Sequence, residues 1–309
     1  MKLTFAFCTY NRARRLDRLV RAMRAQASPI PFEILAVNNN STDDTPAVLD
    51  RLAAEPGAPL RVVTETQPGI VPARNRAIEE TLGSDILVFI DDDELPKPGL
   101  LAAVVGAICD EGAECVGGKV QVDFSEHPRP PWLEDDLLGF LAEVDHGSEA
   151  IWINDTNTPI WTANIAYATE LFRSDPLLRF DPRYNRVGAD VGGGEDGIMF
   201  RTLLDRGARI RYRPDMKVLH AVDDWKLRRS YFLKLHYRAG VRCGRYQLPT
   251  YARTLFDVPP FLLSQLVRQF SRAIGMQLMQ RPGSLRQAMN ATNALGCLVG
   301  YRRRKQTQS

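Results

Sequence analysis

Apolar runs with the composition of β-strands alternate with helical segments over the first 94 residues. The expected strands are 3–7, 32–38, 60–65 and 85–94, and the expected helices cover 13–27, the residues that follow 41–45, and 69–83. Strands that are apolar along nearly their whole length are buried on both faces, which is typical of parallel sheets covered by helices. The pattern therefore predicts an α/β fold built on a mostly parallel sheet.

Polar side chains follow three of these expected strands, in the segments Thr9–Arg12, Asn38–Asn40 and Asp91–Asp93. In open α/β sheets, ligands bind beyond the carboxyl ends of the strands. We therefore expect the three segments to lie along one edge of the sheet. The later sequence is less regular. It predicts a strand over 115–124, irregular structure from about 127 to 157, an extended segment that turns helical within 160–172, a helix over 198–207 and one or two short strands within 208–220.

Three successive acids, Asp91, Asp92 and Asp93, directly follow an apolar run. If the strand continues through them, Asp91 and Asp93 face the same side and Asp92 points away. Adjacent carboxylates repel each other, and a bound cation offsets that repulsion. Oxygen ligands suit Mg²⁺ or Mn²⁺ with a phosphorylated ligand completing the coordination. The alternative is an acidic helix cap.

Short polar residues in 8–12 and 37–44 can hydrogen-bond a base and a ribose, and the aromatic Tyr10 can stack on the base. Turn formation explains the asparagines equally well, because Asn tolerates the left-handed conformation and caps helices. Arg74 lies near an expected helix start, where a phosphate can bind. The alternative is that Arg74 is a solvated helix residue.

The segment 192–196, GGGED, precedes the expected helix 198–207. Glycines permit a close approach to a ligand, and the acids Glu195 and Asp196 suit the positive end of a helix. A loop with capping acids is the alternative. His220 follows at the end of the next strand region and can add a nitrogen ligand to a carboxylate-bound Mn²⁺. Taken alone, His220 is also compatible with an ordinary packed polar residue.

Charge divides the chain into two parts. Residues 226–309 carry sixteen Lys and Arg against one acid, Asp257, a net charge of +15, so residues 1–225 carry −12 of the total of +3. Within the basic part, the apolar residues of 261–279 share one helical face, and 229–246 and 294–305 mix apolar and basic residues. Such helices lie in the headgroup plane of anionic membranes. The alternative is that these faces pack on the rest of the protein or on a second subunit.

Composition excludes several classes of protein. Hydrophobic residues at 44% and charged residues at 25% are globular values, and the five scattered cysteines contain no CxxC pair. A disulfide scaffold, a zinc finger and a disordered chain are therefore not expected. No run approaches the roughly 20 apolar residues of a spanning helix, and the N-terminus lacks the features of a signal peptide. We expect a reduced, cytoplasmic protein, and we find none of the usual nucleic-acid-binding motifs.

Over residues 1–225 the chain resembles the family 2 glycosyltransferases, which are inverting enzymes with the Rossmann-like GT-A fold. The resemblance rests on TYNR, VNNNSTDDT, PARNRA, FIDDDE, WTANIAY, GGGEDGIMFRTLLDRG, YRP and VLH in this order. It looks closest to the branch that builds bacterial exopolysaccharides and lipid-linked glycans. It implies a catalytic domain over 1–225, with a nucleotide-sugar half at about 1–115 and an acceptor half at about 116–225. The basic helical region 226–309 would then be an appendage.

The resemblance also implies roles for individual residues. The nucleotide sugar would be bound by Thr9, Tyr10, Asn11, Arg12, Asn38, Asn39, Arg74, Asp91 and Asp92. The metal, Mn²⁺ or Mg²⁺, would be bound by Asp93 of the DXD motif and by His220. Asp196 would be the general base, with Glu195 beside it, and the acceptor would contact Trp161, Asn164, Gly193 and Gly194.

One departure concerns Asn38 and Asn39, because family members commonly carry Asp at one or both positions. An Asn carbonyl still accepts a hydrogen bond from a base, although without charge. Both uridine and thymidine diphosphate sugars therefore remain open, and a UDP-linked donor is the first expectation. The expected acceptor is a hydroxyl of a glycan or of a lipid-linked saccharide used for cell-surface polysaccharide, at the inner face of the plasma membrane. The alternatives are a nucleotidyltransferase that makes a sugar nucleotide and a non-catalytic carbohydrate-binding protein; homo-oligomerisation is left open.

Overall fold

The computed structural model describes residues 1–187 and 191–306. The chain divides into two compact units, Met1–Gly188 with Glu195–Val222 and Ala189–Gly194 with Asp223–Ser309. The domain boundary expected from charge, between 225 and 226, stays a prediction. Within the described residues, none of the helices combines the length and the apolar character that crossing a bilayer requires.

A nine-stranded sheet forms the centre of the N-terminal unit, in the order β3-β2-β1-β4-β8-β6-β9-β5, with β7 paired to β9. The strands are β1 (Leu3–Thr9), β2 (Phe32–Asn38), β3 (Leu60–Thr64), β4 (Ile86–Ile90), β5 (Glu94–Pro96), β6 (Cys115–Asp123), β7 (Ile151–Ile153), β8 (Asn164–Ala168) and β9 (Ile210–Ala221). The four strands β1 to β4 are parallel, and β8 joins β4 in the antiparallel direction. The expected α/β fold is confirmed.

Helices lie between the strands and after the last strand, β9. They are α1 (Ala13–Arg24), α2 (Thr45–Ala53), α3 (Ile70–Glu80), α4 (Leu100–Val105), α5 (Glu170–Ser174), α6 (Glu195–Asp205), α7 (Arg229–Arg242), α8 (Pro260–Leu278) and α9 (Ser284–Gln306). Short 3₁₀ or π turns are η1 (Gly106–Asp110), η2 (Asp135–Leu141), η3 (Pro182–Tyr184), η4 (Asp224–Leu227) and η5 (Cys243–Gln247). In α1, Leu16, Leu19, Val20 and Met23 are buried at the spacing that predicted this helix.

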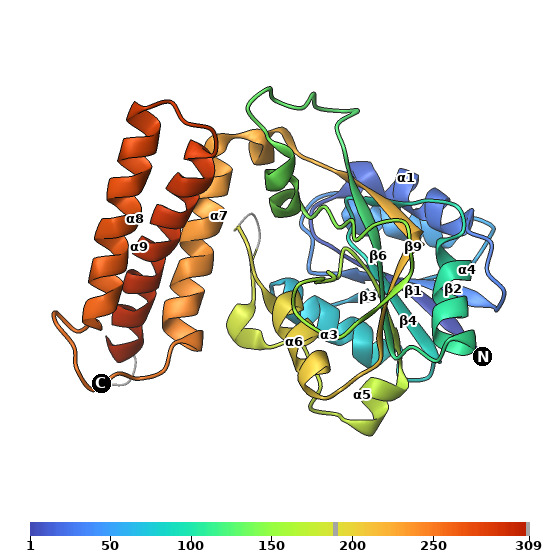
Figure 1. The fold of residues 1–309 in the computed structure, drawn as a ribbon. Helices are drawn as coiled ribbons and strands as arrows, with labels where there is room; N and C mark the ends of the chain where they lie inside the picture. The colour runs from blue at the N-terminus through green and yellow to red at the C-terminus, as the bar shows by residue number, and fades with distance from the viewer. Residues whose placement is uncertain (188–190, 307–309) are drawn as a thin grey trace. The chain divides into compact units, whose positions relative to one another are not determined.

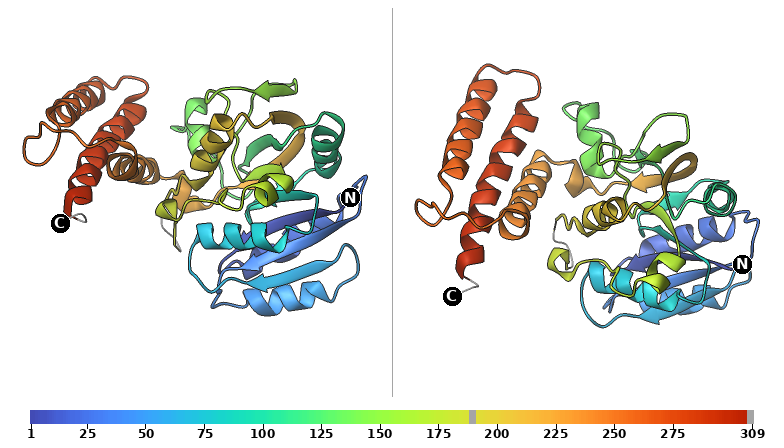
Figure 2. Two further views of the ribbon diagram at one scale, coloured as in Figure 1. Left: turned by 90° about the horizontal axis from the view of Figure 1, so that it is seen from below. Right: turned by 60° about the horizontal axis from the view of Figure 1, so that its bottom comes forward.

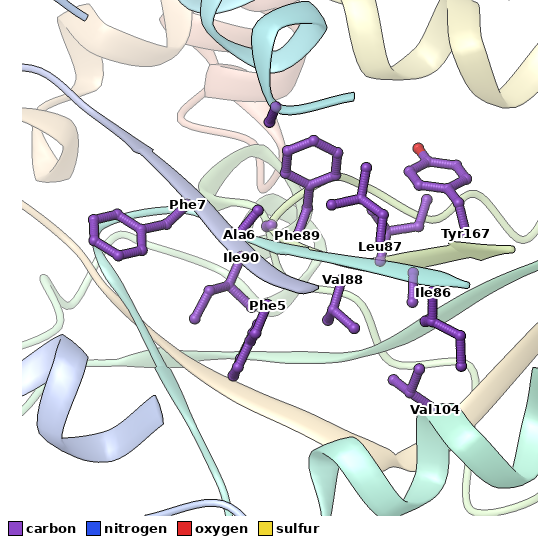
Figure 3. Packing of buried hydrophobic residues seen from close by; sticks show 14 of the residues in the cluster. Phe5, Ala6, Phe7, Ile86, Leu87, Val88, Phe89, Ile90, Val104 and Tyr167 are labelled. Atoms are coloured by element: carbon purple, nitrogen blue, oxygen red, sulfur yellow. The ribbon is translucent and has the colours of Figure 1, made fainter. Parts of the chain in front are cut away.

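Strand β4 lies in the middle of the core, and its side chains alternate between the two faces of the sheet (Figure 3). Val88 points to the face that carries Phe5 and Val104, while Phe89 points to the other face, where its ring meets Tyr167 edge to face at 6.3 Å between centroids. All five side chains are at most 2% exposed. Because both faces of β4 are buried, the run ILVFI contains no polar residue.

The expected strand 85–94 is wrong in its second half. β4 ends at Ile90, and Glu94 begins β5, which pairs with β9 in the antiparallel direction. The chain therefore turns within Asp91–Asp93 instead of continuing as a strand. Two further differences are smaller. The segment 127–157, expected to be irregular, contains η2 and β7, and the one or two short strands expected within 208–220 are a single strand of 12 residues, Ile210–Ala221.

In the C-terminal unit, α9 lies between α7 and α8 (Figures 1 and 2). Glycines allow α9 to approach α7 closely, since a Cβ atom on Gly240, Gly244, Gly296 or Gly300 would overlap backbone oxygens of the facing helix. For Gly300 that oxygen belongs to Val241. The two GxxxG pairs thus replace side-chain packing with contact between backbones.

Gly300→Ala should destabilise the C-terminal unit by about 1–3 kcal/mol, because the added methyl group overlaps a backbone atom that cannot rotate away. We expect a lower unfolding temperature and faster amide hydrogen exchange in α7 and α9. The matched control is Gly275→Ala in α8, where a Cβ would meet nothing within 4 Å. That change should stabilise the protein by roughly 0.5–1 kcal/mol, since Gly is a poor helix residue. Equal stability of the two variants would contradict the close backbone contact.

Candidate functional site

The candidate site lies at the carboxyl ends of neighbouring parallel strands. β1 and β2 end opposite each other at Thr9 and Asn38, and Asp91–Asp93 directly follow β4, which pairs with β1 on its other side. The three polar segments expected at one edge of the sheet therefore follow adjacent strands.

Three asparagines of this edge hold the loops in place. The carbonyl oxygen of Asn11 accepts hydrogen bonds from the backbone N–H groups of Thr42 and Asp43 at 2.8 and 3.3 Å. The side-chain oxygen of Asn38 accepts a hydrogen bond from the backbone N–H of Ser41 at 3.0 Å. Asn11 also adopts a positive φ of 54°, which Asn tolerates. Turn formation therefore accounts for these amide oxygens.

Both the nitrogen and the oxygen of the Asn39 side-chain amide form hydrogen bonds. Its amide nitrogen donates to the carbonyl oxygens of Glu65 and Gln67, and its carbonyl oxygen accepts from the N–H of Gly69 at 2.7 Å. Gly69 has a φ of 123° and directly precedes α3. Asn39 thus fixes the loop from β3 to α3, and with it the start of the helix that carries Arg74.

The side chains of Thr9 and Arg12 both lie close to the carboxylate of Asp92. The Thr9 hydroxyl donates to Asp92 at 2.8 Å, and Arg12 lies 3.9 Å from the same carboxylate. Burial raises the pKa of Asp92 to about 7, the charge of Asp93 adds to the rise, and Arg12 opposes it. Tyr10, beside them, is 43% exposed, so its ring is accessible to a ligand.

The three successive acids have different partners. Asp91 accepts from Arg74 at 2.9 Å, Asp92 contacts Thr9, and Asp93 lies 3.6 Å from Nδ1 of His220. The expectation that Asp91 and Asp93 face the same way depended on an extended strand, and that condition is not met because β4 ends at Ile90. A turn lets one short acidic segment supply several separate contacts.

Arg74 joins α3 to two distant carboxylates. Its guanidinium donates to Glu195 at 2.6 Å and to Asp91 at 2.9 Å, and it lies over the ring of Phe180 at 5.7 Å. The side chain is only 4% exposed, so the interpretation as a solvated helix residue is wrong. Burial alone would lower the pKa of Arg74, but the charges of Asp91 and Glu195 outweigh it and raise the pKa above its ordinary value.

Asp196 lies next to this arginine in the first turn of α6. Burial raises its pKa to about 6, the neighbouring Glu195 adds to the rise, and Arg74 opposes it. One Asp196 oxygen accepts from the N–H of Gly197 at 2.8 Å. A carboxylate whose pKa is raised toward neutrality is suited to accept a proton and still be ionised at pH 7.

His220 faces a second carboxylate that we did not predict as a site residue. Glu94 in β5 pairs directly with His220 in β9, and the imidazole Nδ1 lies 2.8 Å from Glu94 Oε1. Both side chains are buried. Burial raises the pKa of Glu94 to about 7, with Asp93 and Asp91 adding to the rise and His220 opposing it.

These residues fit a divalent cation. Asp93, Glu94 and His220 each offer one ligand atom, and these atoms all lie within 4.8 Å of one another. Within the described part of the chain, the buried oxygen Oε2 of Glu94 has no hydrogen-bond partner. Carboxylate oxygens with one imidazole nitrogen are a donor set that Mn²⁺ accepts.

Asp91 links the cation site to Asp196. Its charge raises the pKa of both Glu94 and Asp196, so both carboxylates lie within electrostatic reach of the same residue. The acids that follow β4, the start of α6 and the end of β9 therefore form one charged cluster.

The residues predicted to contact an acceptor lie in different surroundings. A Cβ atom added to Gly197 would lie 3.7 Å from the indole of Trp161. The indole therefore lies beside the start of α6. Asn164 is buried, and its amide nitrogen donates to the carbonyl oxygens of Lys119 and Met216. Gly193 and Gly194 belong to the C-terminal unit. Acceptor contacts of these four residues stay a prediction.

Glu94 was missed although it ends the motif FIDDDE. The sequence predicts Glu94 as the last residue of one long strand. No sequence feature indicates a contact with His220, which lies 126 positions later. The one available signal for Glu94 as a site residue was that it is a fourth successive acid, since three acids already exceed what a helix cap needs.

The chain matches the protein family "Glycosyl transferase family 2" over residues 4–174, more than half of its length. It is 30% identical over 116 residues to the glycosyltransferase AglE of Haloferax volcanii. That match covers 37% of this chain and 38% of AglE, so the two are comparable over little more than a third of the relative's length.

Two solved structures show the same fold. The S. aureus TarS 1–349 structure in complex with UDP has a TM-score of 0.56 and 16% identity, covering 100% of this chain and 92% of that one. The mannosyltransferase PcManGT from Pyrobaculum calidifontis, in complex with GDP-Man and Mn²⁺, has a TM-score of 0.57 and 19% identity, covering 97% and 86%. At these identities the likeness concerns the fold. With the family match over residues 4–174, it follows that this chain belongs to glycosyl transferase family 2.

Proposed function

We propose that this protein is an inverting, metal-dependent glycosyltransferase that moves a sugar from a nucleoside-diphosphate sugar to a hydroxyl of a glycan or lipid-linked saccharide. The proposal rests mainly on the buried arginine Arg74, which holds Asp91 and Glu195 in one charged cluster beside Asp196. Breaking a sugar–phosphate bond needs positive charge near the leaving group and a base near the attacking hydroxyl. The cluster contains both kinds of group.

The donor is proposed to bind along the carboxyl ends of β1, β2 and β4. Tyr10 offers an exposed ring for the base, and the segments around Thr9–Arg12 and Asn38–Asn39 border it. Their amides are uncharged, and the oxygens of Asn11, Asn38 and Asn39 already accept backbone hydrogen bonds. TarS binds UDP and PcManGT binds GDP-Man. We propose a UDP-linked donor here, with the base tested by thermal shift with UDP, TDP and GDP in the presence of Mn²⁺ or Mg²⁺.

The cation is proposed to bind to Asp93 and His220. A bound Mn²⁺ or Mg²⁺ would neutralise charge that develops on the diphosphate leaving group. Glu94 lies 2.8 Å from Nδ1 of His220, in the position from which a carboxylate orients a histidine ligand. Arg74 adds fixed positive charge within the same cluster.

Asp196 is proposed as the general base. Its raised pKa lets it take the proton of the acceptor hydroxyl while the oxygen attacks the anomeric carbon. Glu195 holds Arg74 through its Oε1 at 2.6 Å and is proposed as a positioning residue beside Asp196. One base and a direct displacement invert the anomeric centre. We propose Trp161, next to α6, as a surface for the acceptor sugar.

The proposed location is the cytoplasmic face of the plasma membrane, where a lipid-linked acceptor for cell-surface polysaccharide would be presented. Residues 1–225 would form the catalytic domain, with the donor bound mainly by 1–115 and the acceptor by 116–225. Residues 226–309, with their net charge of +15, would be attracted to anionic lipid.

Asp196→Asn should abolish transfer and leave donor binding intact, because the amide keeps the shape but cannot take a proton. We expect a rate lower by about 10²–10⁴-fold, measured as release of nucleoside diphosphate from UDP-sugars with Mn²⁺ and a membrane lipid extract as acceptor. Calorimetry with UDP and Mn²⁺ should give an unchanged affinity. The control is Asp205→Asn at the exposed end of the same helix, which should remain fully active. Full activity of Asp196→Asn would remove the base assignment.

The transfer rate should fall as the pH decreases through about 6, because Asp196 must be ionised to act as a base and its pKa is raised to that value. We expect a plateau above this pH and about a tenfold loss per pH unit below it. The measurement is kcat/KM for the acceptor at saturating donor and Mn²⁺. A profile that stays flat down to pH 5 would contradict the assignment.

Glu94→Gln should weaken Mn²⁺ binding by about 10–100-fold, because His220 loses the carboxylate that orients its ring. Isothermal titration of the protein with Mn²⁺ measures this directly, without a transfer assay. Glu170→Gln, at a side chain that is 68% exposed, is the control and should bind Mn²⁺ normally. Unchanged affinity in Glu94→Gln would mean that the cation lies elsewhere.

A further inference from the structure

Helix α8 carries an exposed apolar stripe. Val267, Phe270, Ile274 and Leu278 are 66%, 38%, 58% and 80% exposed, and they follow each other at intervals of three or four residues. This spacing places them on one face of the helix. Scattered apolar residues are common on surfaces, but a continuous row along a helix indicates an interaction surface.

The stripe is not an unfinished part of the core, because α8 already packs through another face. Leu262 is 2% exposed in a small cluster with Cys297 and Tyr301 of α9. Further along, the backbone and side-chain oxygens of Gln269 accept hydrogen bonds from Gln287 of α9. Within the C-terminal unit, α8 lies at the edge of the three-helix layer, with α9 on one side (Figure 2).

Positive charge borders the stripe. Arg268 and Arg272 are exposed one turn apart on α8, on a face adjacent to the apolar row, and the helix contains no acidic residue. Near its end, an open surface depression of about 340 Å³ is lined by Arg272, Arg281, Gly275 and two methionines, Met276 and Met279. Met279 is 65% exposed. Two guanidinium groups beside apolar side chains are suited to a phosphate that is attached to a hydrocarbon chain.

We infer that the outer face of α8 docks on an anionic lipid bilayer, with the apolar stripe in the acyl boundary and a lipid phosphate between Arg272 and Arg281. This deepens the membrane location given under the proposed function and rests on it. A second copy of the chain fits this face poorly, since two rows of arginines without acids would face each other. An anionic surface is complementary to both the charge and the apolar row.

The test uses the full-length protein and vesicle flotation. The wild type should bind vesicles of phosphatidylcholine mixed with phosphatidylglycerol far better than vesicles of phosphatidylcholine alone, and high salt should weaken binding. The double variant Ile274→Gln with Leu278→Gln should lose about tenfold or more of this binding. The double variant Arg272→Gln with Arg281→Gln should lose the preference for the anionic vesicles. Both changes are at exposed positions, so folding should be retained, as an unchanged unfolding temperature would show.

Matched controls lie in the N-terminal unit. Leu177→Gln, at 89% exposure, and Arg21→Gln, at 71% side-chain exposure, should bind vesicles like the wild type. Binding of UDP with Mn²⁺, measured by calorimetry, should be the same in all variants, so a failure of docking is distinguishable from a failure of the proposed enzyme. Wild-type binding by both α8 variants would overturn the inference. A change from dimer to monomer in the Ile274→Gln, Leu278→Gln variant would also overturn it. The inference would be overturned as well if inorganic phosphate stabilised the wild type but not the arginine variant, and neither bound vesicles.

Discussion

The charged cluster depends on one buried arginine. Arg74 contacts two carboxylates, Asp91 after β4 and Glu195 at the start of α6, that are far apart in the sequence. A buried ion pair that loses one partner leaves an uncompensated charge, at a cost of about 3–5 kcal/mol. Arg74 therefore holds α3, the acidic turn and α6 in a fixed relation. The same contact holds one oxygen of Glu195, and burial raises the pKa of the neighbouring Asp196 to about 6.

The loops around the cluster are held by polar side chains that also look like ligand-binding residues. Asn39 ties the end of β2 to the start of α3, and Asn38 and Asn11 close the neighbouring turn. Thr9 donates to Asp92. Each of these bonds fixes a loop of the candidate site. The polar residues of these motifs therefore have a structural role in the loops.

Much of the fold was predictable because it depends on local patterns. The apolar runs 3–7 and 32–38 and the helical spacing of Leu16, Leu19 and Val20 determine β1, β2 and α1 almost alone. The break after Ile90 was not predictable, because β5 exists only through its pairing with β9, more than 120 residues away. For the same reason the sequence did not indicate that Glu94 contacts His220, although Asp93, Asp196 and Arg74 were candidates from their motifs. The burial of Arg74 also required the fold, since its neighbours in the sequence do not reveal it.

The direct pairing of Glu94 with His220 limits how this chain can vary in length. β5 has only three residues, and all three pair with β9. Within this fully described strand, no further paired residues are available to compensate for a shift in this register. A slip of β5 by one residue along β9 would turn the Glu94 side chain to the opposite face of the sheet, away from the imidazole. The acidic turn is therefore constrained in its number of residues by the strand that follows it, in addition to the contacts made by its side chains.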